Sequence, residues 1–395
     1  MRNRNPKHVV FIGLSGFPFG MAAIQRQKLL GRALTSQNWK VTVICTRSTH
    51  PVGTKIRRVG SYMGVLYIYL YSPLRNDSFI IRNAQKLFAP ILEFIILFKL
   101  NRRNKIKVAI VSNRNSFFES LKYFMVSRLI KFRLTINLVE IYKGRANTSL
   151  KNRINDYLFN KFGLFFYDAF LPISDYISDY FAFSKKKYHK IPVIADVTAI
   201  NGVKQQTHGQ PFFLFCGAAA YYKSLNFIIE AFSLLKDMDC KLIIITNGSR
   251  QEMDNIYQKI KINSCEDRVT VLSNISDQEL HVLYKSSVGL LLPLFDSLQD
   301  KARFPHKLAE YLSSGTVILA NPIGDIVNYL KDKETVLYSE VGDKESFSRN
   351  MEWVLKNKNE AKEIGERETF VALNNFDYYF LGKEMSVFFS KLCLQ

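Results

Sequence analysis

Short apolar runs alternate with longer segments of helical periodicity along almost the whole chain. Residues 8–14 have the composition of a buried strand, and residues 21–37 repeat apolar side chains at the spacing of one helix face. Further strands are predicted at residues 40–45, 108–112, 135–140, 169–174 and 189–194. Strands that alternate with helices in this way predict a parallel sheet with helices on both faces.

The alternation lapses in a polar segment at residues 196–209, which we interpret as a linker, and then resumes. The second series has predicted strands at 212–216, 241–246, 269–272, 288–294 and 317–320, with helices at 225–235, 251–262, 277–285 and 378–392. The sequence therefore predicts an α/β fold with two doubly wound, Rossmann-like domains. The expected boundaries are 1–195, the linker 196–209, 210–375, and a C-terminal helix at 376–395 that packs back on the first domain.

Composition narrows the class of protein further. The chain has 395 residues, of which 47% are hydrophobic and 23% charged, as in globular proteins with buried cores. The five cysteines form no C-x-x-C pair, which argues against a disulfide framework or a zinc knuckle and favours a reducing cytoplasm. The opening 23 residues are too interrupted by glycine for a signal peptide, and the longest apolar stretch, 87–100, carries Glu93 and Lys99, so we expect no membrane span.

The positive charge is concentrated in the first part of the chain. Residues 1–155 contain 28 Lys and Arg against four Asp and Glu, a balance of +24, whereas the remainder has a balance of −3. Such asymmetry predicts a surface for an anionic partner, which could be nucleic acid, acidic lipid or a phosphorylated substrate. Segments 87–107 and 117–133 interleave apolar and cationic residues, as interfacial helices do. Packing on a parallel sheet also requires the apolar positions, but we favour contact with an anionic membrane surface.

Several familiar motifs are absent from the sequence. There is no P-loop, and the glycines after the first apolar run lack the G-x-G-x-x-G spacing of dinucleotide binding. Asp237 and Asp239 could hold a metal, but they lie between a predicted helix and a predicted strand, where acidic turn residues are common. We favour the turn, and we expect neither a metal site nor a cofactor.

The segment 301–315 has the clearest chemical pattern. Pro305 is suited to the start of a helix and Gly315 to its end, and the helix would begin just beyond a strand. Leu308 and Leu312 would face inward, while Lys307, Glu310 and Tyr311 would share another face. A helix start flanked by Lys301, Arg303 and Lys307 suits a pyrophosphate, and a carboxylate one turn later could accept hydrogen bonds from a ribose. The alternative is a solvated helix with an ordinary Lys307–Glu310 ion pair.

Three stretches of the chain together resemble a known family. They are residues 17–22 followed by Arg26, residues 215–217 followed by Lys223 and residues 228–232, and residues 292–294 followed by residues 304–315. This order resembles the retaining GT-B glycosyltransferases of family four, especially bacterial enzymes that build capsule, exopolysaccharide or O-antigen. The resemblance implies two Rossmann-like domains that face each other across a cleft.

The resemblance also implies roles for individual residues. Lys223 and Lys307 would neutralise the leaving diphosphate, and Glu310 would bind the nucleotide ribose. The full set that it assigns to donor binding is Gly20, Met21, Ala22, Gly217, Lys223, Arg303, Phe304, Pro305, Lys307, Leu308 and Glu310. A general base should come from the first domain, where Glu140 at the end of the predicted strand 135–140 is our candidate.

Two positions depart from the family pattern. The first glutamate of the family's pair falls on Ala302, and the arginine that usually follows the second-domain glycine falls on Ala218. Arg303 or Lys301 could supply the missing cation, and a subgroup with Phe-Pro and Lys-Leu-x-Glu-Tyr resembles this chain more closely.

We therefore expect metal-independent transfer of a sugar from a nucleotide-diphosphate donor to a glycan or polyprenyl-diphosphate-linked acceptor. The expected place is the inner face of the plasma membrane, with the protein held there peripherally. The alternatives are an impaired GT-B scaffold or nucleotide-binding subunit of a polysaccharide assembly complex, which Ala218 and Ala302 motivate, and a nucleic-acid binder, which the basic half motivates but for which no motif is present.

Overall fold

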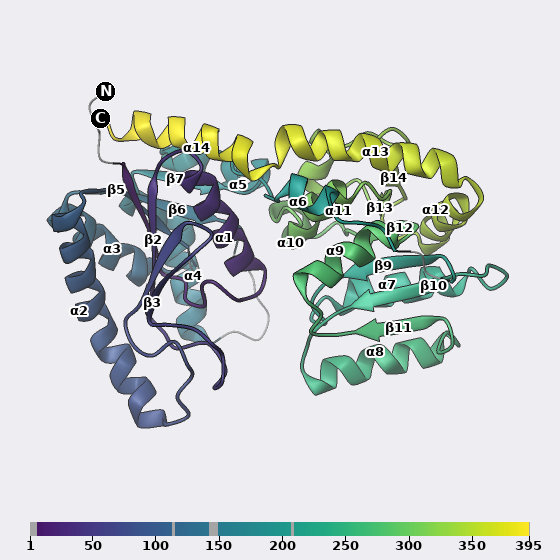
Figure 1. The fold of residues 1–395 in the computed structure, drawn as a ribbon, viewed down its shortest axis with the longest axis horizontal. Coiled ribbons are helices and arrows are strands. Elements are labelled where there is room, and N and C mark those ends of the chain that lie inside the picture. Colours follow the sequence, from purple (N-terminus) through teal and green to yellow (C-terminus); the bar gives the residue numbers. More distant parts are fainter. Residues whose placement is uncertain (1–5, 113–114, 142–148, 207–208, 395) are drawn as a thin grey trace. The chain divides into compact units, whose positions relative to one another are not determined.

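The computed structural model describes residues 6–112, 115–141, 149–206 and 209–394. The chain divides into two compact units, of which the first contains Met1–Ile194 and Tyr378–Gln395 and the second contains Ala195–Asp377. Each unit is a parallel sheet covered by helices (Figure 1). The predicted fold class, α/β with two doubly wound domains, is confirmed.

Among the described residues, the first unit forms an eight-stranded sheet in the order β3-β4-β2-β1-β5-β6-β7-β8. Its strands are β1 (His8–Ile12), β2 (Lys40–Cys45), β3 (Val59–Tyr62), β4 (Val65–Tyr69), β5 (Ile106–Val111), β6 (Arg133–Leu138), β7 (Ala169–Pro172) and β8 (Lys187–Tyr188). The β3–β4 pair is antiparallel, and the other neighbours are parallel. Because the chain order reverses between β1 and β5, the carboxyl ends of these two strands form a topological switch point.

Helices α1 (Ala22–Thr35) and α14 (Tyr378–Leu392) pack together on one face of this sheet. Their apolar side chains join those of β1 and β2 in one buried core. At Gly382 of α14 the two helices touch so closely that an added Cβ would lie 2.3 Å from the Ala33 carbonyl oxygen. The Trp39 indole also donates a hydrogen bond to Ser386 Oγ at 2.8 Å, so the C-terminal helix is tied firmly to the first unit.

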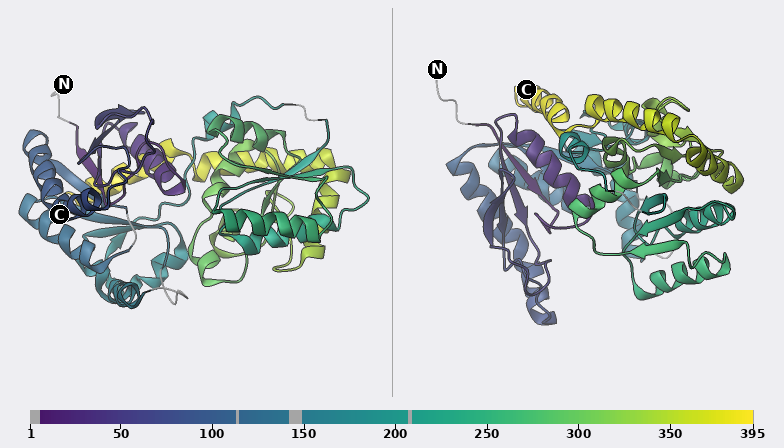
Figure 2. Two further views of the ribbon diagram at one scale, coloured as in Figure 1. Left: turned by 90° about the horizontal axis from the view of Figure 1, so that it is seen from below. Right: turned by 45° about the vertical axis from the view of Figure 1, so that its right-hand side comes forward.

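The other helical segments of this unit are α2 (Phe79–Arg103), α3 (Phe117–Ile130), α4 (Leu150–Phe162), α5 (Asp175–Tyr180) and the 3₁₀ turns Gly163–Phe166 and Ala182–Ser184. Of these, α3 contacts both α2 and α4 (Figure 2). Of the 25 residues in α2, Glu93 and Leu97 are the buried ones. None of the helices in the part of the chain that the structure describes is both long enough and apolar enough to cross a membrane.

The second unit has a six-stranded sheet in the order β11-β10-β9-β12-β13-β14, with every described neighbouring pair parallel. Its strands are β9 (Phe212–Cys216), β10 (Lys241–Ile245), β11 (Val269–Leu272), β12 (Gly289–Leu292), β13 (Ile318–Ala320) and β14 (Leu337–Tyr338). In sequence terms this is the order 3-2-1-4-5-6 of a dinucleotide-binding sheet, with the switch point between β9 and β12.

Helices cover both faces of the second sheet. They are α6 (Val197–Asn201), α7 (Tyr222–Ser233), α8 (Arg250–Ile262), α9 (Asp277–Ser286), α10 (Leu298–Ala302), α11 (His306–Ser314), the 3₁₀ turn Gly324–Asn328, α12 (Lys344–Lys356) and α13 (Lys358–Asn375). Helices α7, α8 and α12 contribute to one buried core, and α11 packs against α6, α9 and α13. Figure 1 shows the strands of this sheet with helices packed around them.

Two segments differ from the sequence-based prediction. No strand forms at residues 189–194, because Pro192 has no N–H to donate and the carbonyls of Ile191 and Pro192 accept hydrogen bonds from Arg26 instead. The segment predicted as a linker, 196–209, contains α6, whose Val197 and Ile200 are buried, so its first part is structured. Residues 207–208 of that segment lie outside the described residues.

Candidate functional site

The switch point of the second unit gathers the residues with the strongest chemical pattern. Strand β9 ends at Cys216 and β12 ends at Leu292, and three helices, α7, α10 and α11, begin in the segments that follow these strands. Carboxyl ends of parallel strands and the starts of the helices after them are where α/β sheets bind anionic ligands. The side chains at this edge of the sheet are therefore the candidates for ligand binding.

Helix α11 begins and ends where the sequence predicts. Pro305 occupies the N-cap position, and Gly315 ends the helix in the left-handed region with φ 74°. An added Cβ at Gly315 would lie 3.2 Å from Thr369 Oγ1, so both conformation and space favour glycine. Leu308 and Leu312 are fully buried, as predicted. The buried leucines fix the rotation of α11 and hence the direction of its polar side chains.

Lys307 and Glu310 form an ion pair on α11. The Lys307 ammonium lies 2.9 Å from Glu310 Oε2, and the Tyr284 phenol donates to the same oxygen at 3.2 Å. The two charged side chains are only 29% and 22% exposed. The predicted ion pair is therefore present, and its two side chains are largely shielded from water.

The charges in this pair stabilise each other. Burial tends to raise the pKa of Glu310, but the Lys307 ammonium outweighs it and lowers the pKa below the usual value. Burial also opposes the charge on Lys307, whose pKa Glu310 nevertheless raises above its usual range. Both groups therefore carry full charge near neutral pH. Burial raises the pKa of the neighbouring Cys216 thiol, so that group is neutral.

Tyr311 does not share the exposed face with Lys307 and Glu310, and that prediction is wrong. The side chain is fully buried, and its hydroxyl accepts a hydrogen bond from the Cys216 N–H at 2.9 Å. Its ring meets that of Tyr284 edge to face, with centroids 5.1 Å apart. Tyr311 therefore holds the end of β9 against α11. Tyr284 cannot be identified from the sequence pattern, because it comes from α9 and meets the Lys307–Glu310 pair only in the folded domain.

Arg303 is held at the start of α7. Its guanidinium pairs with Asp300 at 2.5 Å and lies 4.4 Å from the centroid of the Tyr221 ring. Tyr221 belongs to the turn of Ala218, whose carbonyl accepts the Tyr221 N–H at 3.0 Å. Lys301, by contrast, pairs with Asp296 where both side chains are well exposed. Arg303, one of the two candidate replacements for the missing cation, therefore contacts the turn that contains Ala218.

Asp300 was not recognised from the sequence, although it lies within the segment of interest. It is 6% exposed, and its second oxygen accepts the Phe295 N–H at 3.1 Å. This carboxylate thus joins the segment after β12 to Arg303. Its position three residues before Arg303 on a helical turn was the available signal.

The remaining second-unit candidates divide into charged and structural residues. Lys223 lies in the first turn of α7, with its ammonium 4.0 Å from the centroid of the Phe295 ring. At Gly217 an added Cβ would lie 2.7 Å from the Phe215 ring, so a side chain there would have to displace that ring. Phe304 is buried and stacks on Tyr329 with centroids 5.5 Å apart, which indicates a packing role.

The first-unit candidates lie at the carboxyl edge of their own sheet. Gly20 precedes Met21, the N-cap of α1, and Ala22 is the first residue of that helix. An added Cβ at Gly20 would lie 2.6 Å from Ile24, so glycine is required for this helix start. Arg26, one turn on, is buried, which lowers its pKa to about 9, and it donates to main-chain carbonyls rather than facing the loop.

Glu140 and the paired aspartates lie in loops. Strand β6 ends at Leu138, so Glu140 lies two residues beyond it rather than ending the strand, and its carbonyl accepts from Asn115 Nδ2 at 3.0 Å. Asp239 accepts from Gln210 Nε2 at 2.6 Å in the turn before β10. No cluster of three or more His, Cys, Asp or Glu residues with the geometry of a metal site occurs in residues 6–112, 115–141, 149–206 and 209–394.

Comparison with known proteins supports a specific family for the second unit. Residues 196–369 match the family model "Glycosyl transferases group 1", so the chain carries a group 1 glycosyltransferase domain. No curated protein matches the chain in sequence.

Solved structures extend the likeness to both units. Sucrose-phosphate synthase of Thermosynechococcus elongatus is 14% identical with a TM-score of 0.75, covering 98% of this chain and 99% of its own. HepE of Anabaena in complex with UDP is 11% identical with a TM-score of 0.68, and the match covers 98% of this chain and 100% of HepE. The lipopolysaccharide outer core galactosyltransferase WaaB is 13% identical with a TM-score of 0.60, and the match covers 97% of this chain and 99% of WaaB. The chain thus has the two-domain fold of GT-B glycosyltransferases.

Proposed function

We propose that this protein is a retaining glycosyltransferase that transfers a sugar from a nucleotide-diphosphate donor to a glycan or polyprenyl-diphosphate-linked acceptor in cell-surface polysaccharide synthesis. The observation that carries the proposal is the shielded Lys307–Glu310 pair on α11, at the switch point of the group 1 domain. A solved protein of the same fold binds UDP, and another is a lipopolysaccharide galactosyltransferase, which supports both the donor class and the pathway class.

The donor diphosphate would bind at the starts of α7 and α11. The first N–H groups of a helix have no partner within the helix, and the helix dipole favours an anion there. Lys223 and Arg303 add full charges beside the start of α7. Because Arg303 is held by Asp300 and the Tyr221 ring, we propose that it replaces the arginine for which Ala218 stands.

Glu310 would hold the nucleotide ribose. Lys307 and Tyr284 both bond to Oε2, which leaves Oε1 as the acceptor for ribose hydroxyl groups. Lys307 keeps the carboxylate charged and fixes its orientation, and charged acceptors make the stronger hydrogen bonds. In the first unit, Gly20, Met21 and Ala22 would offer N–H groups at the start of α1 to the donor.

The chemistry follows from the charge that develops as the sugar leaves the diphosphate. Fixed cations and N–H dipoles stabilise that negative charge without having to reorganise during the step. The sugar would pass through an oxocarbenium-like state, and retention of configuration is what the family resemblance implies. Lys223 and Lys307 would carry most of this stabilisation, and Glu140 is the proposed general base for the acceptor hydroxyl. In this proposal the reaction requires neither a metal nor a cofactor.

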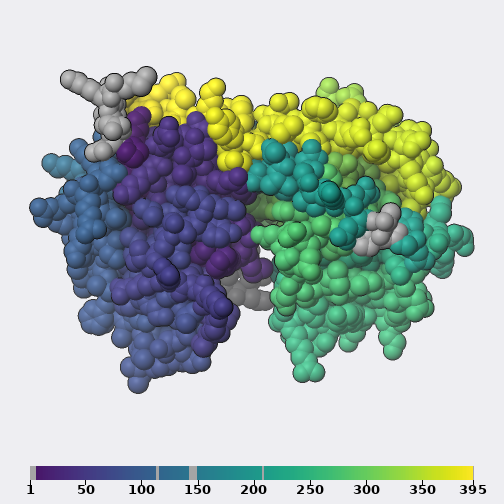
Figure 3. All heavy atoms as spheres, in the orientation of Figure 1, coloured from purple at the N-terminus to yellow at the C-terminus, as the bar shows by residue number. Residues whose placement is uncertain are grey.

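The surface of α2 supports a peripheral place at the cytoplasmic membrane face. Its exposed apolar side chains include Phe79, Ile80, Leu87, Phe88 and Ile91, each more than half exposed. The basic residues Arg102 and Arg103 end the helix. Figure 3 shows this segment, in blue, on the outer surface of its unit. An apolar helix with cations at its end suits an anionic leaflet, where a polyprenyl-linked acceptor resides.

A second candidate is a nucleotide-binding scaffold without turnover, which Ala302 and Ala218 favour. The deciding experiment is a panel of UDP-, GDP-, ADP- and CDP-sugars, with the melting temperature and the release of nucleoside diphosphate as readouts. We expect one donor to raise the melting temperature and to be hydrolysed slowly, because binding to the native state alone must stabilise it. Stabilisation without hydrolysis or transfer would favour the scaffold, and no stabilisation by any donor would reject both.

A further inference from the structure

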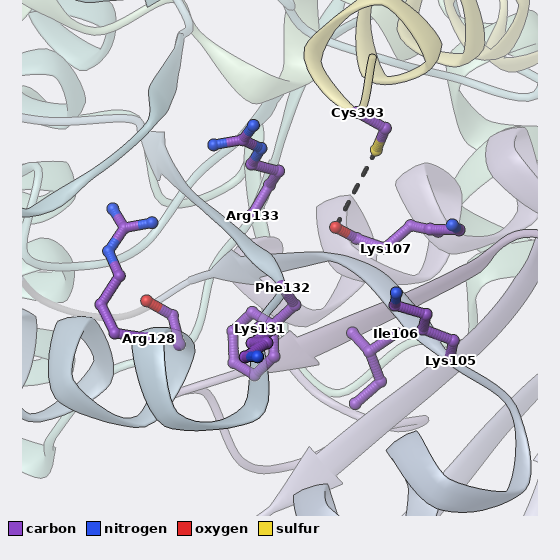
Figure 4. Close-up of a pocket in the computed structure, with 9 residues that line it drawn as sticks. Lys105, Ile106, Lys107, Arg128, Lys131, Phe132, Arg133 and Cys393 are labelled. Atoms are coloured by element: carbon purple, nitrogen blue, oxygen red, sulfur yellow. Dashed lines mark hydrogen bonds between the residues drawn. The ribbon is translucent and has the colours of Figure 1, made fainter. Parts of the chain in front are cut away.

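A second basic site lies in the first unit, at the amino ends of its strands. A cavity of about 330 Å³ opens between the starts of β5 and β6, the end of α3 and the end of α14 (Figure 4). It is lined by Lys105, Ile106, Lys107, Ser127, Arg128, Lys131, Phe132, Arg133 and Cys393. Because strand amino and carboxyl ends lie at opposite edges of a parallel sheet, this cavity is separate from the switch point between β1 and β5.

The five cationic side chains of the cavity are poorly neutralised. Asp168 lies 3.0 Å from Arg128 and 3.6 Å from Arg133, and it also accepts the Leu134 N–H. Within the residues that the structure describes, no carboxylate lies at ion-pair distance from the other three cations, Lys105, Lys107 and Lys131. Burial raises the pKa of the Cys393 thiol, so that group adds no negative charge. The cavity therefore keeps a large excess of positive charge.

Only two of the five cationic side chains lie at a helix end whose dipole favours positive charge. Arg128 lies in the last turn of α3 and Lys131 is its C-cap, where cations are favoured by ~0.3–1 kcal/mol each. Lys107 and Arg133 lie on strands, and Lys105 immediately precedes one. Strands have small net dipoles, so no local backbone charge compensates these residues.

We propose that this cavity binds a phosphate-bearing ligand, such as a diphosphate or a phosphorylated lipid headgroup. Ammonium and guanidinium groups are the usual donors to phosphate oxygens, and Figure 4 shows them arranged around the opening from separate elements. The buried Ile106 and Phe132 give the cavity an apolar base. Its volume is at the lower end of the range for small-ligand pockets, ~300–1,000 Å³.

The neighbouring helix α2 supports the possibility that the phosphate belongs to a lipid headgroup. Asn101, in the last turn of α2, donates to the Ile130 carbonyl at 3.2 Å and accepts the Ile106 N–H at 2.8 Å. The C-terminal end of the exposed, apolar α2 is thus fastened directly beside the cavity. A soluble phosphorylated compound would satisfy the same cations, so the test must separate the two sources.

The test uses the full chain and a variant with Lys105→Gln, Lys107→Gln and Lys131→Gln. The matched control carries Lys204→Gln, Lys236→Gln and Lys261→Gln, which remove the same charge from exposed positions of the second unit. Inorganic pyrophosphate is titrated at low ionic strength while the melting temperature is measured. Vesicles of phosphatidylcholine, with and without phosphatidylglycerol, form the second arm. Any pyrophosphate bound in the second unit contributes equally to both proteins.

We expect pyrophosphate to stabilise the control as it does the wild type, and the cavity variant to require at least tenfold more pyrophosphate. Without ligand, the cavity variant should melt at a higher temperature than the control, because it lacks the mutual repulsion of the cations. Loss of binding to phosphatidylglycerol vesicles in the cavity variant alone would identify a lipid headgroup, and unchanged vesicle binding would identify a soluble phosphate. An equal pyrophosphate response in variant and control, or no response in any protein, would overturn the proposal. Donor binding in the second unit is measured separately, so this result does not depend on the proposed transferase activity.

Discussion

Glu310 Oε2 accepts two hydrogen bonds, one from the Lys307 ammonium at 2.9 Å and one from the Tyr284 hydroxyl at 3.2 Å. Two donors on one oxygen orient the carboxylate and leave Oε1 directed away from them. A group that must hold a ribose in one place benefits from this arrangement, because its rotamer is fixed before the ligand arrives. The pair therefore acts as one unit, and its members should respond together to substitution.

Lys307→Ala and Glu310→Ala are each expected to reduce sugar transfer by more than tenfold, or ~1.4 kcal/mol. The first removes charge from the diphosphate site and the second removes the ribose acceptor. Because each also disorganises the other, the double variant should lose much less than the product of the two single losses. Steady-state transfer with the donor identified by the nucleotide-sugar panel provides the measurement.

An exposed ion pair in the same unit provides the control for the Lys307 and Glu310 substitutions. Lys331 and Glu334 have the same i,i+3 spacing, but their nitrogen and oxygen lie 3.7 Å apart and their side chains are 78% and 65% exposed. Lys331→Ala should leave both transfer and the melting temperature nearly unchanged, since exposed pairs contribute little. Near-normal transfer in both Lys307→Ala and Glu310→Ala would remove the proposed donor site.

Arg303→Lys should weaken donor binding more than Lys301→Gln. A lysine cannot reproduce the planar stacking on Tyr221 or the fork that engages Asp300, whereas Lys301 pairs with Asp296 at the surface. We expect Arg303→Lys to raise the dissociation constant for the nucleoside diphosphate by about tenfold, as measured by calorimetry. A larger effect from Lys301→Gln would mean that the exposed lysine supplies the cation.

The helix 306–314 was predictable because its signals are local. Proline at the start, glycine at the end and apolar residues four apart all lie within one segment, so they predict α11 and the Lys307–Glu310 spacing directly. Tyr284 and Cys216 were not predictable, since they meet the pair only when α9 and β9 pack against α11. Local periodicity carries no information about such long-range contacts.

The prediction of a strand at 189–194 was wrong for a related reason. Its apolar composition was correct, because Ile191, Val193 and Ile194 are buried. Its carbonyl groups, however, bond to the buried guanidinium of Arg26, far away in sequence, and Pro192 removes a donor from any sheet ladder. The sequence thus predicted burial correctly but not the hydrogen-bonding partner.

The exposed face of α2 should be a membrane-binding surface. Ile80→Gln, Leu87→Gln and Phe88→Gln together are expected to weaken binding to phosphatidylglycerol vesicles by more than tenfold, because a buried apolar side chain contributes ~1.5–3 kcal/mol. The melting temperature should change little, since these side chains already contact water in the folded protein. Vesicle sedimentation is the measurement.

Exposed apolar residues of the second unit are the control for the α2 variant. Tyr257, Ile262 and Phe370 are each more than half exposed, and their replacement by Gln removes comparable apolar area. We expect this variant to bind vesicles like the wild type. Equal losses in the two variants would indicate nonspecific adsorption rather than a surface on α2.

Glu368 should make the stability of the second unit fall as pH rises. Its side chain is fully buried on α13, and Oε1 accepts the Ile318 N–H at 2.9 Å, while Oε2 has no partner among the described residues. Burial raises the pKa of Glu368 well above 4.5, against the opposing effect of the Ile318 N–H. The folded protein therefore keeps this proton to a higher pH than the unfolded chain does.

The sign of the effect follows from this proton. The stabilisation is complete below the pKa of the unfolded chain, and it decreases by ~1.4 kcal/mol per pH unit until the folded pKa is reached. Glu368→Gln cannot lose a proton, so its stability relative to the wild type should rise as the pH increases above the pKa of the unfolded chain, as measured by urea unfolding. Glu366→Gln, at an exposed position of the same helix, should show no such trend. Parallel pH profiles for Glu368→Gln and the wild type would mean that Glu368 is ionised in the folded protein, and a buried cation would then have to be sought beside it.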